Sequence, residues 1–319
     1  MPLRVAVQMD PLEGINISGD STFALMLGAQ ARGYTLFHYL ADALTWQDGR
    51  LYAGAHEVSV QAISGDHFQA GEFTILDLGR DVDVVLMRQD PPFDLGYITA
   101  THLLERIQGE TLVVNDPASV RGAPEKVWVL DFAQFMPPTV ITRSLGVARK
   151  FLAQQGDIVV KPLHGYAGGS VFRIGAGGRN LASLMEVFNR TYQEPHVLQK
   201  FIPEISQGDK RIILIDGEVA GAVNRVPGEG EIRSNLAVGG TAAKTELTDR
   251  EREICAVLGP KCRERGLLFV GIDVIGGRWL TEINVTSPTG IVAVDKFNGT
   301  DTPGLFWDAI ERRLAERQS

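Results

Sequence analysis

Three side chains that carry oxygen lie on two apolar segments late in the sequence. Asp273 falls within FVGIDV, and Glu282 and Asn284 fall within LTEINV. Because side chains alternate along a strand, Glu282 and Asn284 are predicted to share one face, while Thr281 and Ile283 point to the other. Two carboxylates and an amide oxygen suit Mg²⁺ that also bridges nucleotide phosphates, and their burial without a cation is costly. The spacing predicts a magnesium site, and the alternative is a polar, solvated sheet face.

A glycine-rich loop separates two short apolar segments in the middle of the chain. The stretch DIVVKPLHGYAGGSVF places Lys161 at the end of one predicted strand and Gly165, Gly168 and Gly169 in the loop that follows. Glycines let backbone N–H groups approach phosphate oxygens, and the lysine adds a positive charge. The loop joins strand to strand, and no Gly-Lys pair of a Walker loop occurs in the chain. Phosphate binding is one interpretation, and a hairpin loop beside a surface lysine is the other.

Arginines recur in polar, glycine-rich stretches between these two features. Arg211 stands in DKR, Arg225 in RVPG, and Arg233 in EIRSNLAVGG. Guanidinium groups bind carboxylates and phosphates through two parallel hydrogen bonds. Each arginine alone is better explained as a solvated surface charge. Their joint position between a phosphate loop and a metal site favours a binding role.

The elements that must position these groups follow two patterns. Up to about residue 122, apolar runs alternate with helical patterns, which is typical of a parallel α/β domain. Ligands of such domains bind at the carboxyl ends of the strands, here residues 8–16 and 88–93. Beyond a turn-rich stretch, short strands of antiparallel character mix with helices, including a long helix over about 248–265 that Pro260 is expected to kink. The strands expected in the first part are residues 4–9, 35–40, 82–87 and 112–114, and its helices are residues 21–32 and 97–107.

Composition excludes several classes of protein. The 319 residues allow about two domains. With 31 Lys and Arg against 39 Asp and Glu, the net charge of −8 argues against a nucleic-acid-binding protein. The chain has no run of about 18 apolar residues, so no membrane span is predicted. The N-terminus lacks a signal-peptide pattern. Cys255 and Cys262 are too few for a disulfide framework and are expected to be buried and reduced. A cytoplasmic location is therefore expected.

Taken together, the motifs resemble the ATP-grasp enzymes, and specifically the bacterial glutathione synthetases. The motifs that carry the likeness are, in order, MDPLEGIN at 9–16, MRQDPPFD at 87–94, EK at 125–126, KP at 161–162, GDKR at 208–211, RVP at 225–227, NLA at 235–237, GID at 271–273 and EINVTSP at 282–288. The likeness therefore covers essentially the whole chain. It implies an α/β and α+β fold: an N-terminal parallel α/β, substrate-side domain over 1–122, then a two-lobed ATP-grasp unit with a central lobe over 123–200 and a C-terminal lobe over 201–319.

The resemblance also implies a reaction. ATP drives the ligation of γ-glutamylcysteine to glycine through an acyl phosphate, which gives glutathione, ADP and phosphate. The implied cofactors are ATP and Mg²⁺, with Mn²⁺ as an alternative ion, and the implied assembly is a homo-oligomer, by resemblance a tetramer. Two other interpretations stay open: an ATP-grasp carboxylate–amine ligase that extends a peptide or protein tail, and a nucleotide-binding regulator without catalysis.

The implied roles of individual residues fall into four groups. The residues implied to bind the nucleotide are Lys126, Lys161, Gly165, Gly168, Gly169, Gln199, Lys200, Phe201, Ile202 and Asp209. Those implied to bind or cover the other substrates are Arg88, Asn235, Gly239, Gly240, Ser287 and Thr289. The implied catalytic residues are Arg211 and Arg225, which would face the acyl phosphate, and the implied metal ligands are Asp273, Glu282 and Asn284. The chain departs from the family pattern at His164, Tyr166, Ala167 and Thr241, which bears on loop closure and not on the class of reaction.

Overall fold

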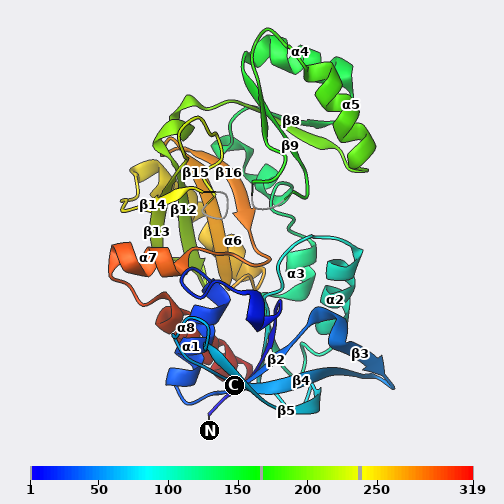
Figure 1. Cartoon of the computed structure of the whole chain (residues 1–319), viewed down its shortest axis with the longest axis vertical. Coiled ribbons are helices and arrows are strands. Elements are labelled where there is room, and N and C mark those ends of the chain that lie inside the picture. Colours follow the sequence, from blue (N-terminus) through cyan, green and yellow to red (C-terminus); the bar gives the residue numbers. More distant parts are fainter. Residues whose placement is uncertain (1, 166–167, 236–238, 319) are drawn as a thin grey trace.

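Three β-sheets follow one another along the long axis of the molecule (Figure 1). The computed structural model describes residues 2–165, 168–235 and 239–318. The seven-stranded sheet of the N-terminal domain lies at one end, the five-stranded sheet of the C-terminal lobe in the middle, and the four-stranded sheet of the central lobe at the far end. Among the described residues, no helix is long and apolar enough to cross a membrane.

The N-terminal sheet is parallel at its centre and antiparallel at one edge. Its parallel strands, in spatial order, are β2 (Thr35–Tyr39), β1 (Arg4–Gln8), β6 (Val84–Met87) and β7 (Leu112–Val114). These four strands lie where the sequence predicts them. The antiparallel extension, which the sequence analysis does not anticipate, consists of β3 (Leu44–Gln47), β4 (Arg50–Val60) and β5 (Phe68–Asp77). Ala53 and Ala55 occupy buried positions of β4, and such small residues give only a weak apolar alternation.

Two helices of this domain start at matching caps. Its helices are α1 (Ser21–Ala31), α2 (Leu95–Glu105) and the short α3 (Pro117–Arg121). The Asp20 carboxylate accepts a hydrogen bond from the backbone N–H of Phe23 at 2.7 Å, and Asp94 accepts one from Tyr97 at 2.9 Å. Each cap satisfies an N–H group that has no partner inside its helix. The helix starts are therefore fixed just beyond β1 and β6, at the edge where ligands bind in parallel sheets.

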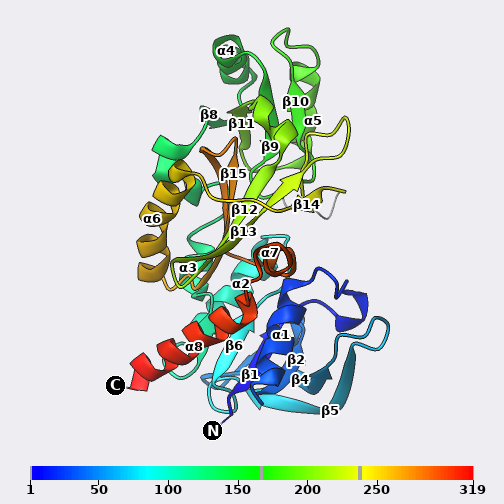
Figure 2. The same cartoon turned by 90° about the vertical axis from the view of Figure 1, so that its left-hand side faces the viewer.

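The central lobe is a small α/β unit at one end of the molecule (Figure 2). It has its own hydrophobic core. Its antiparallel strands, in spatial order, are β10 (Phe172–Ile174), β9 (Ile158–Pro162), β11 (His196–Lys200) and β8 (Thr139–Thr142). Two helices cover the sheet, α4 (Leu145–Gln155) and α5 (Leu181–Thr191). Its core cluster includes Phe151, Met185 and Leu198 and takes no residue from the other two sheets.

The C-terminal lobe is built on a five-stranded antiparallel sheet. Its strands, in spatial order, are β14 (Thr241–Ala243), β13 (Glu218–Val226), β12 (Asp209–Ile215), β15 (Phe269–Ile275) and β16 (Trp279–Asn284). The helices are α6 (Asp249–Glu264), α7 (Ile291–Asn298) and α8 (Thr302–Gln318). A capping box between Thr248 and Glu251 starts α6, and Glu251 also pairs with Lys210 of β12 at 2.6 Å. The expected α6 is confirmed, and it continues as one helix through Pro260.

The N-terminal domain and the C-terminal lobe share their hydrophobic cores. One cluster joins Leu51 of β4 to Leu280 of β16, and another joins Phe23 of α1 to Trp307 of α8. The indole Nε1 of Trp307 also donates a hydrogen bond to the carbonyl oxygen of Leu25 at 2.8 Å. These two parts therefore form one packed body, which also includes Trp128 and Phe132, whereas the sheet and helices over residues 139–200 pack on a core of their own. Short 3₁₀ helices at Leu12–Gly14, Ala41–Ala43, Trp128–Phe135 and Pro203–Gln207 complete the connections.

Candidate active site

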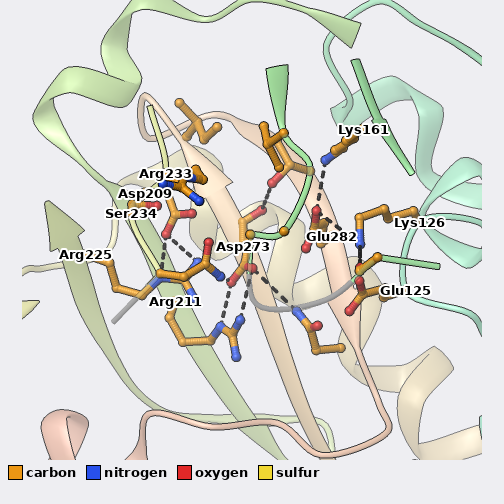
Figure 3. Close-up of a pocket in the computed structure, with 18 of the residues that line it drawn as sticks. Glu125, Lys126, Lys161, Asp209, Arg211, Arg225, Arg233, Ser234, Asp273 and Glu282 are labelled. Atoms are coloured by element: carbon orange, nitrogen blue, oxygen red, sulfur yellow. Dashed lines mark hydrogen bonds and ion pairs between the residues drawn. The ribbon is translucent and has the colours of Figure 1, made fainter. Parts of the chain in front are cut away.

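A cavity of about 320 Å³ lies where the central lobe faces the C-terminal sheet (Figure 3). The predicted site residues that line it are Lys126, Lys161, Gly165, Gly168, Gly169, Gln199, Lys200, Phe201, Ile202, Asp209, Arg211, Arg225, Asn235, Asp273, Glu282, Asn284, Ser287 and Thr289. Arg88, Gly239 and Gly240 do not line it. The fold thus brings together residues from seven of the named motifs, which lie up to about half the chain apart in sequence.

The floor of the cavity is a network of buried, alternating charges on neighbouring strands. Arg211 of β12 lies opposite Asp273 of β15, and Asp209 lies opposite Arg225 of β13. Arg211 Nε and Nη2 lie 2.6 and 3.0 Å from the two Asp273 oxygens. Arg225 bridges both carboxylates, with Nε 2.7 Å from Asp209 Oδ1 and Nη2 3.0 Å from Asp273 Oδ1. Both guanidinium groups are therefore held in fixed positions before any substrate arrives.

These contacts set the protonation of the two aspartates differently. Burial would raise the pKa of Asp273, but Arg211 and Arg225 outweigh it and lower this pKa below its ordinary value. Burial and the Asp273 charge raise the pKa of Asp209, against the opposing effect of Arg225. Asp273 is thus the more strongly anionic of the pair. The floor combines a carboxylate suited to a cation with two arginines suited to an anion.

A β-bulge decides which side chains of β16 reach the cavity. Asp273 pairs with Glu282, but the next residue, Val274, pairs with Leu280, so Thr281 is the extra residue. Glu282 and Asn284 line the cavity as predicted. Thr281 also borders it, contrary to the predicted alternation, because the bulge places Leu280 in the core with Ile283. The alternation of apolar residues along one strand does not reveal this shift in register, because a bulge depends on the partner strand.

Glu282 connects the floor to the lysines on the opposite side. Its carboxylate lies 2.9 Å from Lys161 Nζ and 3.6 Å from Lys126 Nζ. Burial would raise the pKa of Glu282, but these two ammonium groups lower it to about 2. Burial would lower the pKa of Lys126, but Glu282 and Glu125 raise it. Two charged lysines therefore face the cavity beside the carboxylates.

Glu125 is a cavity residue to which the sequence analysis gives no role. It contacts Lys126, whose Nζ also donates to the carbonyl oxygen of Gly165 at 2.6 Å. Burial raises the pKa of Glu125, and Lys126 opposes that effect. The position of Glu125 next to Lys126 in the EK motif is the one sequence signal that could have marked it. Through Lys126, it helps to hold the start of the glycine loop.

The three predicted metal ligands fit a divalent cation. The side chains of Asp273, Glu282 and Asn284 converge on one cavity, where Asn284 Nδ2 lies 3.5 Å from Asp273 Oδ2. Two carboxylates and an amide oxygen are the hard ligands that Mg²⁺ and similar ions prefer. Among the described residues, no group of three or more His, Cys, Asp or Glu side chains could hold a metal. A cation here would depend on the Asn284 amide and on oxygens of the nucleotide.

An apolar slot borders the cavity at the end of β11. Next to the predicted Gln199 to Ile202 segment it is lined by Val159, Ile205 and Ile275. Apolar side chains beside two lysines can hold a purine ring while the phosphates extend toward the charges. The strand that borders this slot can be predicted from the sequence, but Ile205 and Ile275 cannot, because they look like ordinary core residues in their own segments.

The glycine loop and the segment before residue 236 approach each other over the cavity. Gly168 has a φ of 74°, and a Cβ atom there would lie 2.7 Å from Asn235 Oδ1. Only glycine fits such a position without displacement of its neighbour. Gly239 and Gly240 lie outside the cavity wall, where Gly240 N–H donates to the carbonyl oxygen of Asn235 at 3.2 Å. Tyr166 and Ala167 lie outside the described residues.

His164 connects the glycine loop to the N-terminal domain. Its ring centroid lies 5.8 Å from that of Phe93, and Phe93 in turn lies 5.3 Å from the ring of Tyr97. Burial, together with the charge of Lys126, lowers the pKa of His164. A neutral imidazole at neutral pH suits this contact between rings. The departure from the family pattern at His164 therefore corresponds to a specific contact between two lobes.

Arg88 is buried beside the cavity rather than in its wall. Its Nε donates to Thr22 Oγ1 at 3.0 Å and its Nη2 to the carbonyl oxygen of Pro288 at 2.8 Å. Its guanidinium carbon lies 5.0 Å from the ring centroid of Phe269. Ser287, whose hydroxyl donates to the carbonyl oxygen of Arg88 at 3.2 Å, does line the cavity. Arg88 thus adjoins the end of the cavity nearest the N-terminal domain.

A cavity between two antiparallel sheets, with two lysines on one side and two carboxylates and an amide on the other, is the arrangement of an ATP-grasp ligase. Solved structures support the fold. The D-cycloserine synthetase DcsG aligns with a TM-score of 0.66 at 18% identity, over 98% of this chain and 99% of that one. The ATP-grasp ligase PsnB, in complex with a variant precursor, Mg and ADP, aligns with a TM-score of 0.61 at 18% identity, over 100% and 99%.

Within that class, the chain belongs to the prokaryotic glutathione synthetase family. The family's N-terminal domain matches residues 3–121 and its ATP-grasp domain matches residues 125–299. The chain is 58% identical to the glutathione synthetase of Rhodopseudomonas palustris, over 99% of this chain and all of that one. It is 44% identical to that of Pseudomonas syringae pv. tomato, over 100% of both.

Family membership settles the reaction. The chain is an ATP-dependent ligase that joins γ-glutamylcysteine and glycine through an acyl phosphate, and it uses ATP with a divalent metal ion. The predicted fold class and activity are confirmed. The two other interpretations, a ligase of peptide or protein tails and a regulator without catalysis, lose their support because full-length relatives are glutathione synthetases.

Proposed function

We propose that the two sides of the cavity have different roles in the reaction. Lys126 and Lys161 bind the phosphates of ATP, and the slot at the end of β11 takes the adenine. Arg211 and Arg225 bind the cysteinyl carboxylate and then the acyl phosphate formed on it. The observation that carries this division is the buried floor network, in which both guanidinium groups are fixed by Asp209 and Asp273 before reaction.

Phosphoryl transfer needs positioning and charge neutralisation more than a protein nucleophile. The γ-phosphoryl group passes to an oxygen of the cysteinyl carboxylate, and ADP leaves. The glycine amine then attacks the acyl carbon, and phosphate leaves while the amine loses a proton. Negative charge develops on oxygens in both steps, and donors that are already oriented stabilise it without reorganisation. Arg211 and Arg225 have that property, since both are nearly buried and paired.

We assign the metal-ligand role to Asp273, Glu282 and Asn284, with Mg²⁺ as the ion and Mn²⁺ as the alternative. The oxygen-only donor set supports this choice. A bound ion would supply further neutralisation of phosphate charge. The lowered pKa values of Asp273 and Glu282 keep both ligands anionic at neutral pH.

We assign water exclusion to the glycine loop and to the segment that holds Asn235. An acyl phosphate hydrolyses in water, so the closed site must keep solvent away. The close approach of Gly168 to Asn235 supports this role. Arg88, Ser287 and Thr289 bind the peptide substrate in this proposal. The turn at Gly239 and Gly240 shapes the covering segment rather than contacting substrate.

The remaining expectations are also proposals. We propose a boundary near residue 122 between the N-terminal domain and the grasp unit, and a second near residue 200 between its two lobes. We propose a homotetramer in the cytoplasm, as the family resemblance implies. The separate core of the central lobe, which ends at Leu198, supports the boundary near residue 200.

A phosphate-release assay in which each substrate is omitted in turn tests the proposed function. The chain with ATP and Mg²⁺ should release phosphate at full rate only when γ-glutamylcysteine and glycine are both present. Without glycine, hydroxylamine should trap the acyl phosphate as a hydroxamate, and Arg225→Ala should greatly reduce this product. Equal phosphate release with and without glycine would mean that water reaches the acyl phosphate, and the assigned role of the covering segments would then be wrong.

A further inference from the structure

Arg173 of β10 is a charged residue of the central sheet without a role in the proposed function. It lies directly opposite Val159 of β9, which in turn lies opposite Gln199 of β11. Residues that are directly opposite on neighbouring strands present their side chains on the same face of a sheet. Val159 and Gln199 both line the cavity, whereas Val160 and Leu198 point to the core of the lobe. Arg173 therefore belongs to the face of the sheet that carries the apolar slot.

The guanidinium group of Arg173 covers the ring of Phe201. Its Cζ atom lies 4.1 Å from the ring centroid. A cation in this position is attracted by the electrons of the aromatic face. Phe201 lines the cavity at the end of β11, while Arg173 does not belong to the described wall of the cavity. The contact of Arg173 with the slot therefore runs through the Phe201 ring.

Asp157 fixes the orientation of this guanidinium group. Arg173 Nε and Nη2 donate to Asp157 Oδ2 at 3.0 and 2.5 Å, and the backbone N–H of Ala176 donates to Asp157 Oδ1 at 2.9 Å. These hydrogen bonds lower the pKa of Asp157, so its carboxylate stays anionic. The side chains of Arg173 and Asp157 are 48% and 32% exposed, and an ion pair this exposed contributes little to stability. Its effect is on the orientation of Arg173.

Asp157 also holds the backbone of Phe201. Its carbonyl oxygen accepts a hydrogen bond from the Phe201 N–H at 2.9 Å. Phe201 stands where the chain leaves the central lobe, just before the 3₁₀ helix Pro203–Gln207, which supplies Ile205 to the slot. Phe201 does not belong to the described core cluster of the central lobe. Its position therefore depends on Asp157 and Arg173, which hold its backbone and its ring.

We propose that Arg173 is a positioning residue for the nucleotide base: together with Asp157, it holds Phe201 in the wall of the slot. The inference rests on the proposed function, which places adenine in this slot. Because Arg173 lies behind Phe201, it acts on the binding of ATP and not on the reacting groups. An interaction that stabilises the bound substrate and the transition state equally changes KM and leaves kcat unchanged.

Kinetics with and without a base on the phosphates test the proposal. Arg173→Ala should raise the KM for ATP about two- to fivefold with kcat unchanged, and Arg173→Lys, which keeps a cation beside Phe201, should restore most of the affinity. Inorganic tripolyphosphate carries the phosphate charges without a base, so its inhibition constant against ATP should not change in Arg173→Ala. Arg190→Ala, which removes an exposed arginine of α5 that pairs with Glu186, is the matched control and should leave both constants unchanged. An equal rise of both constants in Arg173→Ala would show an effect on the whole lobe and would overturn the proposal.

Two further variants separate this inference from the proposed function. Phe201→Leu removes the ring but keeps an apolar side chain, so Arg173→Ala should have no additional effect on the KM for ATP in this background. Additive effects would overturn the inference. Ile275→Ala changes the slot from the C-terminal lobe and should raise the KM for ATP without Arg173. If Ile275→Ala leaves this KM unchanged, the proposed adenine slot is wrong. If Ile275→Ala raises it and Arg173→Ala does not, only the role of Arg173 is wrong.

Discussion

The two sheets that face the cavity are anchored in different ways. The C-terminal sheet shares its hydrophobic clusters with the N-terminal domain, whereas the central sheet packs only within its own lobe. The C-terminal sheet supplies the buried network of Arg211, Arg225 and Asp273, and the central sheet supplies Lys161 and the glycine loop. Parts with separate cores are the natural units of motion. With the roles proposed above, the reacting groups belong to a fixed floor, whereas Lys161 and the glycine loop belong to a separate, movable lobe.

Removal of an arginine from the fixed floor should have the largest effect. Arg211→Ala should lower kcat about 10³-fold, because a pre-oriented donor to the reacting oxygens is lost, while binding of a non-hydrolysable ATP analogue changes little. Steady-state kinetics and calorimetry measure the two quantities. Arg211→Lys keeps a charge beside Asp273 and separates loss of charge from loss of geometry.

Arg263→Ala serves as the control in the same lobe, since Arg263 pairs with Asp216 and Glu218 at the surface. It should retain full turnover. Unchanged turnover in Arg211→Ala would contradict the idea that the floor carries the chemistry.

Core substitutions should destabilise the central lobe and the rest of the molecule separately. Leu198→Ala in the central cluster and Leu280→Ala in a shared cluster should each cost about 2–5 kcal/mol, since both side chains are fully buried. Amide hydrogen exchange should rise only within residues 139–200 for Leu198→Ala, but across the N-terminal domain and C-terminal lobe for Leu280→Ala. Exchange that rises throughout the chain in Leu198→Ala would show that the lobes do not open independently.

Loss of a cation from the movable lobe should affect binding more than chemistry. Lys161→Ala removes an ammonium group 2.9 Å from Glu282, so the KM for ATP should rise about 10- to 100-fold, with a smaller change in kcat than in Arg211→Ala. Lys150→Ala, an exposed lysine of α4 in the same lobe, is the matched control. If kcat fell as far in Lys161→Ala as in Arg211→Ala, the proposed difference in role between the floor and the central lobe would be contradicted.

The contact between the Phe93 and His164 rings should have the smallest effect. Aromatic pairs contribute about 0.5–1.5 kcal/mol, so the coupling energy in a double-mutant cycle of Phe93→Ala and His164→Ala should correspond to a factor of about 2 to 10. The readout is the gain in ATP-analogue affinity on addition of γ-glutamylcysteine. Fully additive effects would mean that this contact does not connect the loop to the N-terminal domain.

Much of this site follows from local sequence, because its residues sit in short motifs on strands with clear apolar flanks. Lys161, Asp273, Glu282 and Asn284, which stand out in the sequence, all line the cavity. Which side chain pairs with which does not follow from local sequence. The pairing of Arg211 with Asp273 depends on the register between β12 and β15, which lie more than 50 residues apart.

Other features of the fold also could not be predicted from local sequence. The bulge at Thr281 depends on the partner strand, and the strands β3 to β5 present small buried residues and an exposed outer face. Composition likewise hides the basic groups of the active site within a chain whose net charge is −8.

The hydrogen bond from Trp307 to Leu25 has a consequence for synthesis on the ribosome. The two residues lie 282 positions apart, and Trp307 is fully buried in the cluster that also contains Phe23. Domains generally fold in order as the chain emerges. Here the first helix cannot complete its packing until the last one has left the exit tunnel. The N-terminal domain therefore completes its packing late, and until then part of its apolar surface is exposed to chaperones. The central lobe, which has its own core, can fold before it.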